Sequence, residues 1–126
     1  MDHEKVVQEA CNLAIEKLGW QNKIKFRPMK RSSHVNIRRG FVIGRTNLKT
    51  GLITIDIWTP KFRRPKTVAG ILRTLAHEIA HHQKRPFRQR FRGRVITRAH
   101  YPEFYQQVSK NILFFKKDKI LNKFFI

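Results

Sequence analysis

The fold of this chain is decided by residues 67–83, which read TVAGILRTLAHEIAHHQ. Apolar side chains recur there at intervals of three and four residues, which is the period of a helix with one buried face. Thr67 can accept a hydrogen bond from the first turn, and Pro86 prevents the helix from continuing. The residues predicted to face the core are Val68, Ile71, Leu72, Leu75, Ala76, Ile79 and Ala80.

The same helix carries an HExxH motif at residues 77–81. A step of four residues places two imidazoles on one helical face, where their nitrogens can bind one zinc ion at about 2.0–2.1 Å. Glu78 is rotated by about 100° from His77 and lies beside the metal position, where it can transfer protons. The apolar stripe faces the opposite side, so the histidines and the small residues Gly70 and Thr74 predict the floor of a cleft. The plainer interpretation is two solvated histidines on a polar face.

A catalytic zinc site needs a third protein ligand and one open position. His100 follows His81 by 19 residues and directly precedes another helical pattern, so a hairpin of two helices would return it to the metal. Glu103 is an alternative ligand, and a different residue or no third ligand also stays open. The neighbouring His82 points about 100° away from His81, so it cannot share the same ion.

Outward from this helix, the chain alternates helical and strand-like patterns. A basic segment over 87–99 is expected to form a loop, although its alternating arginines would also suit one face of a short strand. The order of the patterns predicts an α+β fold with an N-terminal helix, a short twisted sheet, the HExxH helix and a C-terminal helix. The other predicted elements are helices over 3–18 and 101–115, strands over 41–43 and 52–58, and a turn over 47–51.

Two segments carry a family resemblance. Residues 75–82, LAHEIAHH, and residues 100–104, HYPEF, resemble the SprT-like and related minimal gluzincin-type metallopeptidases, which have a zincin-like fold. The resemblance spans about residues 67–108 and, more loosely, the helix and sheet pattern before them. Two features depart from it, because no zinc ribbon follows the core and the segment between the two helices is rich in arginine.

The resemblance implies a site and an activity. It implies Zn²⁺ bound by His77, His81 and His100, with Glu78 as the general base of peptide-bond hydrolysis. It also implies a sheet edge that pairs with an extended substrate, for which residues 52–58 are the nearest match.

The charge of the chain is strongly positive. There are 28 Lys and Arg residues against 8 Asp and Glu, giving a formal net charge of +20. This balance argues against an ordinary acidic cytosolic enzyme and favours a polyanionic partner, DNA or RNA. Residues 79–102 contain no acidic residue, and Phe87 and Phe91 alternate there with arginines. The predicted nucleic-acid-binding residues are Arg85, Arg88, Arg90, Arg92, Arg94 and Arg98.

Three functions fit these patterns. The leading hypothesis is a single-domain zinc metalloendopeptidase, residues 1–126, which cleaves protein or peptide substrates on or near nucleic acid. The alternative is a basic nucleic-acid or ribonucleoprotein-binding module with a structural or vestigial zinc site. The third is a latent enzyme, in which residues 114–126 occlude the cleft and Asp118 reaches the zinc; the plainer interpretation of this segment is a tail that packs on the domain. Without a recognisable leader or membrane-spanning run, we expect a cytoplasmic protein.

Overall fold

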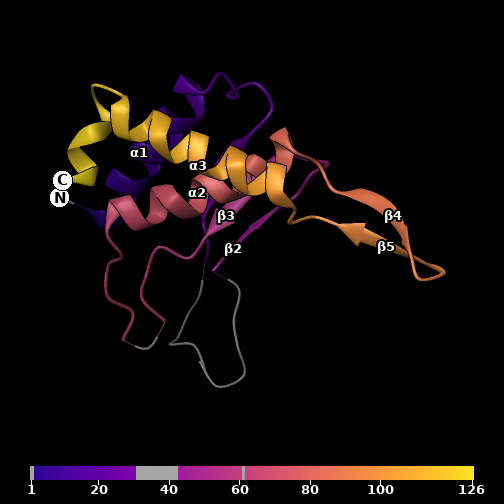
Figure 1. Cartoon of the computed structure of the whole chain (residues 1–126). Helices are drawn as coiled ribbons and strands as arrows, with labels where there is room; N and C mark the ends of the chain where they lie inside the picture. The colour runs from indigo at the N-terminus through magenta and orange to yellow at the C-terminus, as the bar shows by residue number, and fades with distance from the viewer. Residues whose placement is uncertain (1, 31–42, 61) are drawn as a thin grey trace.

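A computed structural model describes residues 2–30, 43–60 and 62–126 of the chain (Figure 1). The fold is α+β, as predicted, and none of the helices in these ranges is long and apolar enough to cross a membrane. In chain order the elements are α1 (His3–Lys17), β1 (Lys25–Pro28), β2 (Gly44–Thr46), β3 (Leu52–Ile55), α2 (Val68–Gln83), β4 (Phe87–Phe91), β5 (Arg94–Arg98), α3 (Pro102–Lys117) and the 3₁₀ turn η2 (Leu121–Phe125).

The sheet has the strand order β1-β3-β2, with β3 parallel to β1 and antiparallel to β2. The expectation that residues 52–58 form the substrate-pairing edge is therefore wrong, because β3 is hydrogen-bonded on both sides. Its alternation of buried and half-buried residues reflects that central place. β1 was not predicted, since only Phe26 of its four residues is buried and no alternating pattern stands out. Residues 41–42 of the predicted strand lie outside the described residues, and β2 begins at Gly44.

The core lies between the sheet and two helices. α1 and α2 cover the face of the sheet that carries Ile53 and Ile55, and α3 packs along α2 (Figure 1). The predicted cap of α2 is confirmed, because the Thr67 hydroxyl accepts a hydrogen bond from the Gly70 N–H at 3.1 Å. α2 is thus enclosed by the sheet on one side and by α3 on another, which leaves only a narrow strip of it exposed.

The segment after α2 is a β-hairpin and not the expected loop. β4 and β5 pair antiparallel around the turn Arg92-Gly93, and the ribbon extends away from the rest of the molecule (Figure 1). The strand alternative considered for the arginines is closer to the structure. However, Arg94 pairs with Phe91 and so lies on the face opposite Arg88 and Arg90, which means that the charges do not share one face.

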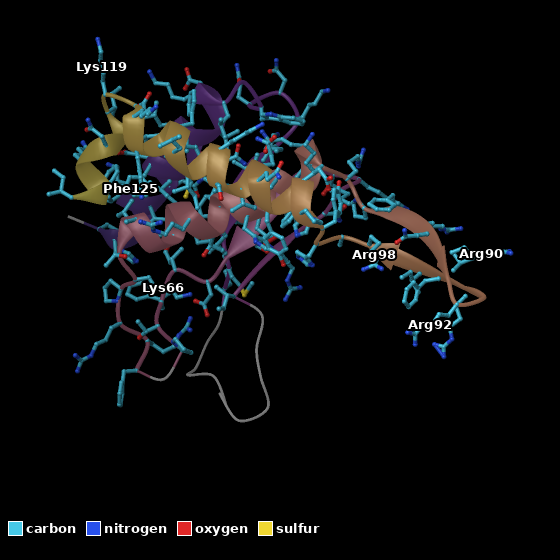
Figure 2. The ribbon with its side chains drawn as sticks, in the orientation of Figure 1. Lys66, Arg90, Arg92, Arg98, Lys119 and Phe125 are labelled. Atoms are coloured by element: carbon cyan, nitrogen blue, oxygen red, sulfur yellow. The ribbon has the colours of Figure 1, made fainter. Side chains whose placement is uncertain are left out.

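The C-terminal residues pack on the domain end opposite the hairpin (Figure 1). The carboxylate of Asp118 accepts hydrogen bonds from the Ile120 and Leu121 N–H groups and lies 3.8 Å from the Lys17 Nζ. Leu121 is fully buried, and Phe125 (labelled in Figure 2) contacts the core and lies under the Arg73 guanidinium. Asp118 is therefore held at the end of α3, away from the histidines.

Cys11 lies on the buried face of α1. Its side chain is fully buried, and burial raises the pKa of its thiol far above the ordinary value. The thiol is therefore held in its unreactive protonated form.

The turn before β3 depends on a glycine. Gly51 has φ +79°, and an added Cβ would lie 1.8 Å from the Lys23 carbonyl oxygen. We expect Gly51→Ala to lower the free energy of unfolding by about 2 kcal/mol or more, through a backbone clash added to conformational strain. Gly19→Ala is the matched control, because Gly19 has φ +81° but open space around its Cα. It should cost about 1 kcal/mol. Urea denaturation measures the free energy of unfolding of both variants. Equal losses would show that conformational strain alone, without the backbone clash, accounts for the effect of Gly51→Ala.

Candidate metal centre

Three histidines from two helices meet at one point of the surface. His77 and His81 lie one turn apart on α2, and His100 lies two residues before α3. Each offers a ring nitrogen, and these nitrogens all lie within 4.8 Å of one another. The ring centroids are 5.0 Å apart for His77 and His81, 5.3 Å for His77 and His100, and 4.9 Å for His81 and His100. The hairpin of helices expected from the sequence therefore does bring residue 100 back to the motif.

A buried aromatic ring supports the three imidazoles. Phe104 is fully buried, and its centroid lies 5.0 Å from His77, 4.5 Å from His81 and 5.1 Å from His100. Burying a phenylalanine side chain contributes roughly 1.5–3 kcal/mol. Because Phe104 is in the first turn of α3, its burial against α2 also fixes the position of the preceding His100.

A buried amide fixes α3 against α2 further along. The Asn111 side chain is 1% exposed, and its Nδ2 donates to the Ala76 carbonyl at 3.1 Å and to the Gln83 Oε1 at 2.7 Å. Its Oδ1 accepts from the Gln107 Nε2 at 3.0 Å. A buried amide that lost these partners would leave polar atoms unpaired, so only one alignment of the two helices satisfies them.

Two of the histidines, His77 and His81, are held in the neutral form, which is the form that binds metals. Burial lowers the pKa of His81 to about 4, with further lowering from the neighbouring His77 and His100. Burial also lowers the pKa of His77, and the proximity of His100 adds to this effect. Both imidazoles are therefore neutral near pH 7, with a nitrogen lone pair available.

Glu78 is a buried carboxyl group beside the histidines. It is 6% exposed, and burial raises its pKa to about 7. A group with a pKa near the working pH can both take up and release a proton. It borders a cleft of about 510 Å³, which Thr74 and His77 line as predicted, whereas Gly70 and His81 do not line it. The lining residues are Ile43, Gly44, Arg73, Thr74, His77, Glu78 and Val108.

The alternative ligands do not join the group. His82 is hydrogen-bonded through its Nε2 to the Thr46 hydroxyl, which directs its ring toward β2, as the helical geometry predicts. Glu103 is exposed in the first turn of α3 and is not part of the cluster that the described residues form.

The predicted basic residues lie on and beside the hairpin. Arg85 donates to the Leu48 carbonyl at 3.0 Å, and the Arg98 Nε donates to the Gln89 Oε1 at 2.8 Å. The remaining four, Arg88, Arg90, Arg92 and Arg94, are exposed along β4, the turn and the start of β5.

Sequence reasoning missed two residues that build the site, Phe104 as a support and Asn111 as a clamp. Phe104 belongs to the HYPEF segment and to the apolar pattern that predicts the final helix, but neither pattern indicates its contact with the three imidazoles. Asn111 follows it by seven residues, on the same helical face as the buried Phe115. A single polar residue at a core position of an amphipathic helix is the signal that would have identified it.

Comparisons with known proteins give one weak likeness. No protein-family model matches the chain, and no curated protein matches it. Among solved structures, the crystal structure of the metallopeptidase zymogen of Pyrococcus abyssi abylysin is similar, with 22% sequence identity and a TM-score of 0.47 over 93% of each chain. A likeness of this size assigns no function to the chain, so the function must be argued from the site itself.

The contribution of Asn111 to the packing of α3 on α2 can be tested directly. We expect Asn111→Leu to lower the free energy of unfolding by about 1–3 kcal/mol, because Gln83 loses its hydrogen-bond donor and a buried amide is replaced. Asn12→Leu is the control, since Asn12 is exposed and accepts only from the nearby Gln8 side chain. It should change stability by less than about 0.5 kcal/mol. Chemical denaturation of both variants decides the matter, and similar stabilities would refute the role of Asn111.

Proposed function

We propose that this protein is a zinc-dependent metalloendopeptidase. The observation that carries the proposal is the convergence of three imidazoles beside a buried carboxyl group, where His77 and Glu78 line an open cleft. His77, His81 and His100 would hold the metal, and Glu78 would act as the general base.

The donor set fits zinc. Within residues 2–30, 43–60 and 62–126, no other group forms a hydrogen bond to these three imidazoles, so their nitrogens are available to a cation. Imidazole is a preferred ligand of zinc, and three protein ligands with one open position are typical of catalytic zinc sites. In the same ranges no fourth His, Cys, Asp or Glu joins the group, which supports a catalytic site over a closed structural one.

The chemistry would be shared between the metal and the chain. Zinc supplies Lewis-acid chemistry, polarising the scissile carbonyl and making water acidic enough to attack it near neutral pH. Glu78 would accept the proton of the attacking water and later deliver it to the departing amine. Its burial raises its proton affinity for the first of these steps, and a bound cation nearby would moderate that effect.

The substrate would lie along β2. This strand occupies one end of the sheet order, and its first residue, Gly44, borders the cleft that contains Glu78. A Cβ added to Gly44 would meet the Thr74 Cγ2 at 3.1 Å, so the absence of a side chain lets this strand approach α2 closely. An extended peptide pairing with the outer edge of β2 would then place its backbone beside Glu78.

Action on proteins bound to nucleic acid remains a prediction that rests on charge. The net charge of +20 and the acid-free stretch of residues 79–102 support it. The alternative of a purely binding module is favoured by the same charge, but it leaves the buried Glu78 beside the histidines without a role.

Zinc binding tests whether His100 is the third metal ligand. Purified protein should carry one zinc ion per chain, measured by elemental analysis after dialysis. We expect His100→Ala to weaken zinc affinity by at least about 100-fold, which exceeds the usual loss of an outer-shell partner. His82→Ala is the matched control, since His82 neighbours the motif but bonds to Thr46. Equal zinc contents in wild type and His100→Ala would refute the proposed ligand set.

Turnover tests the role of Glu78. We expect Glu78→Gln to keep stoichiometric zinc and to lose about 10²–10⁴-fold in the rate of peptide hydrolysis, because the amide cannot accept a proton. Glu103→Gln removes an exposed carboxylate one turn from His100 and should leave the rate unchanged. Cleavage of a quenched fluorescent unfolded protein measures both variants. Full activity of Glu78→Gln would contradict the assignment of the base.

A further inference from the structure

The β4–β5 hairpin gains little stability from contacts with the rest of the molecule. Every residue of its two strands is exposed except Ile96, which is half-buried. No other described helix or strand packs extensively on it, and the main contact at its base is the ring pair of Phe87 and Tyr101, 5.0 Å apart. An isolated two-stranded ribbon is at best marginally stable in water. Packing on the domain therefore does not explain which side chains the hairpin carries.

The cross-strand register divides the side chains between two faces. Residues that are paired across antiparallel strands lie on the same face, and the faces alternate along each strand. Arg88 pairs with Thr97 and Arg90 pairs with Val95, and these four form what we call the Arg88 face. The opposite face carries Phe87, Gln89, Phe91, Arg94, Ile96 and Arg98.

The aromatic side chains of that opposite face are already engaged. Phe91 lies under two guanidinium groups, 5.2 Å from the Arg92 Cζ and 5.8 Å from the Arg98 Cζ. Arg98 also donates to Gln89, and Phe87 packs on Tyr101. These contacts stiffen the ribbon, and a base that stacked on either ring would compete with the guanidinium groups or with Tyr101.

The Arg88 face is open. Within the described part of the chain, the guanidinium groups of Arg88 and Arg90 form no ion pair or hydrogen bond, and Figure 2 shows Arg90 extending away from the ribbon. The residues opposite them, Val95 and Thr97, are smaller. The two long cationic side chains of β4 therefore extend beyond the shorter side chains that face them on β5. No acidic residue occurs in residues 79–102.

The turn places a further charge at the tip. Arg92 and Gly93 have φ +51° and +78°, the two positive values of a tight hairpin turn that favours Asn-Gly. Arginine at the first position is strained relative to asparagine or glycine. Arg92 lies at the tip of the ribbon, with its guanidinium over the Phe91 ring (Figure 2). Such strain at an exposed tip points to a role in contact rather than in folding.

From these features we infer that the β4–β5 hairpin is a docking arm that enters the major groove of duplex DNA. That groove, about 12 Å wide, admits a two-stranded β-ribbon. Arg88 and Arg90 face the base edges or phosphates, Val95 and Thr97 allow close approach, and Arg92 contacts the backbone at the tip. This inference is independent of the metal centre.

Single-stranded nucleic acid and duplex RNA fit the hairpin less well. Single strands are held mainly by stacking on free aromatic faces, and the two rings of the hairpin are occupied. The major groove of duplex RNA is deep and narrow, so a ribbon cannot enter it.

Fluorescence anisotropy with a labelled mixed-sequence DNA duplex tests the arm, with each isotherm measured at several salt concentrations. Wild-type protein should show a steep linear fall of log affinity with log salt. The variant Arg88→Gln with Arg90→Gln should reduce that slope by about 2 and weaken binding by roughly 10-fold or more. The matched control, Lys110→Gln with Lys116→Gln, makes the same charge change on exposed positions of α3 and should leave binding within about 3-fold.

A second variant distinguishes a role of the turn residue in DNA contact from a role in the folding of the hairpin. Arg92→Asn places a preferred residue in the turn, so it should keep or raise the melting temperature while lowering the salt slope by about 1. A ligand that fills the major groove should compete with wild-type protein, and a minor-groove ligand should not. The inference is overturned by equal losses in the Arg88/Arg90 and Lys110/Lys116 variants. It is also overturned by tighter binding to single-stranded DNA or duplex RNA, by competition from the minor groove alone, or by no binding of duplex DNA.

Discussion

The site depends on the packing of α3 against α2. Two of its imidazoles belong to one helix, and the third precedes the other helix, so the group exists only while the helices keep one alignment. Phe104 supplies the apolar contact under the three rings, and Asn111 supplies the directional one. Apolar burial alone would tolerate small shifts along the helix, whereas hydrogen bonds to Ala76 and Gln83 do not. Stability and site geometry therefore rest on the same contacts.

Two buried carboxyl groups show how environment separates a structural role from a chemical one. Burial alone would raise the pKa of Asp56, but two hydrogen bonds from the Arg63 guanidinium at 2.7 and 2.9 Å, one from the Trp58 N–H and the nearby positive charges of Arg63 and Lys66 hold it below the usual value. Asp56 thus stays ionised and fixes the loop after β3. For Glu78, burial is the cause that dominates, and its pKa rises to about 7. The carboxyl group that is able to exchange protons is the one beside the histidines.

The hairpin and the metal centre are joined by the chain itself. β4 follows α2 and β5 leads into His100, so the chain passes from the HExxH helix to the third histidine through the basic ribbon. The ribbon is anchored at its base, where the Tyr101 hydroxyl donates to the Arg85 carbonyl and the Tyr101 ring meets Phe87. A partner bound to the ribbon would therefore act on residues adjacent to the third histidine.

The sequence alone determined the features that depend on local spacing. The apolar period and Thr67 predicted α2, the four-residue step aligned two histidines, and the turn over 47–51 and the final helix were also placed correctly. The metal-ligand and base assignments built on them remain predictions. Only the tertiary structure decided which strand lies at the edge of the sheet, that 87–99 is a paired hairpin, and that Asn111 clamps the two helices. Strand order and cross-helix hydrogen bonds join residues far apart in the chain, and no local periodicity records such pairings.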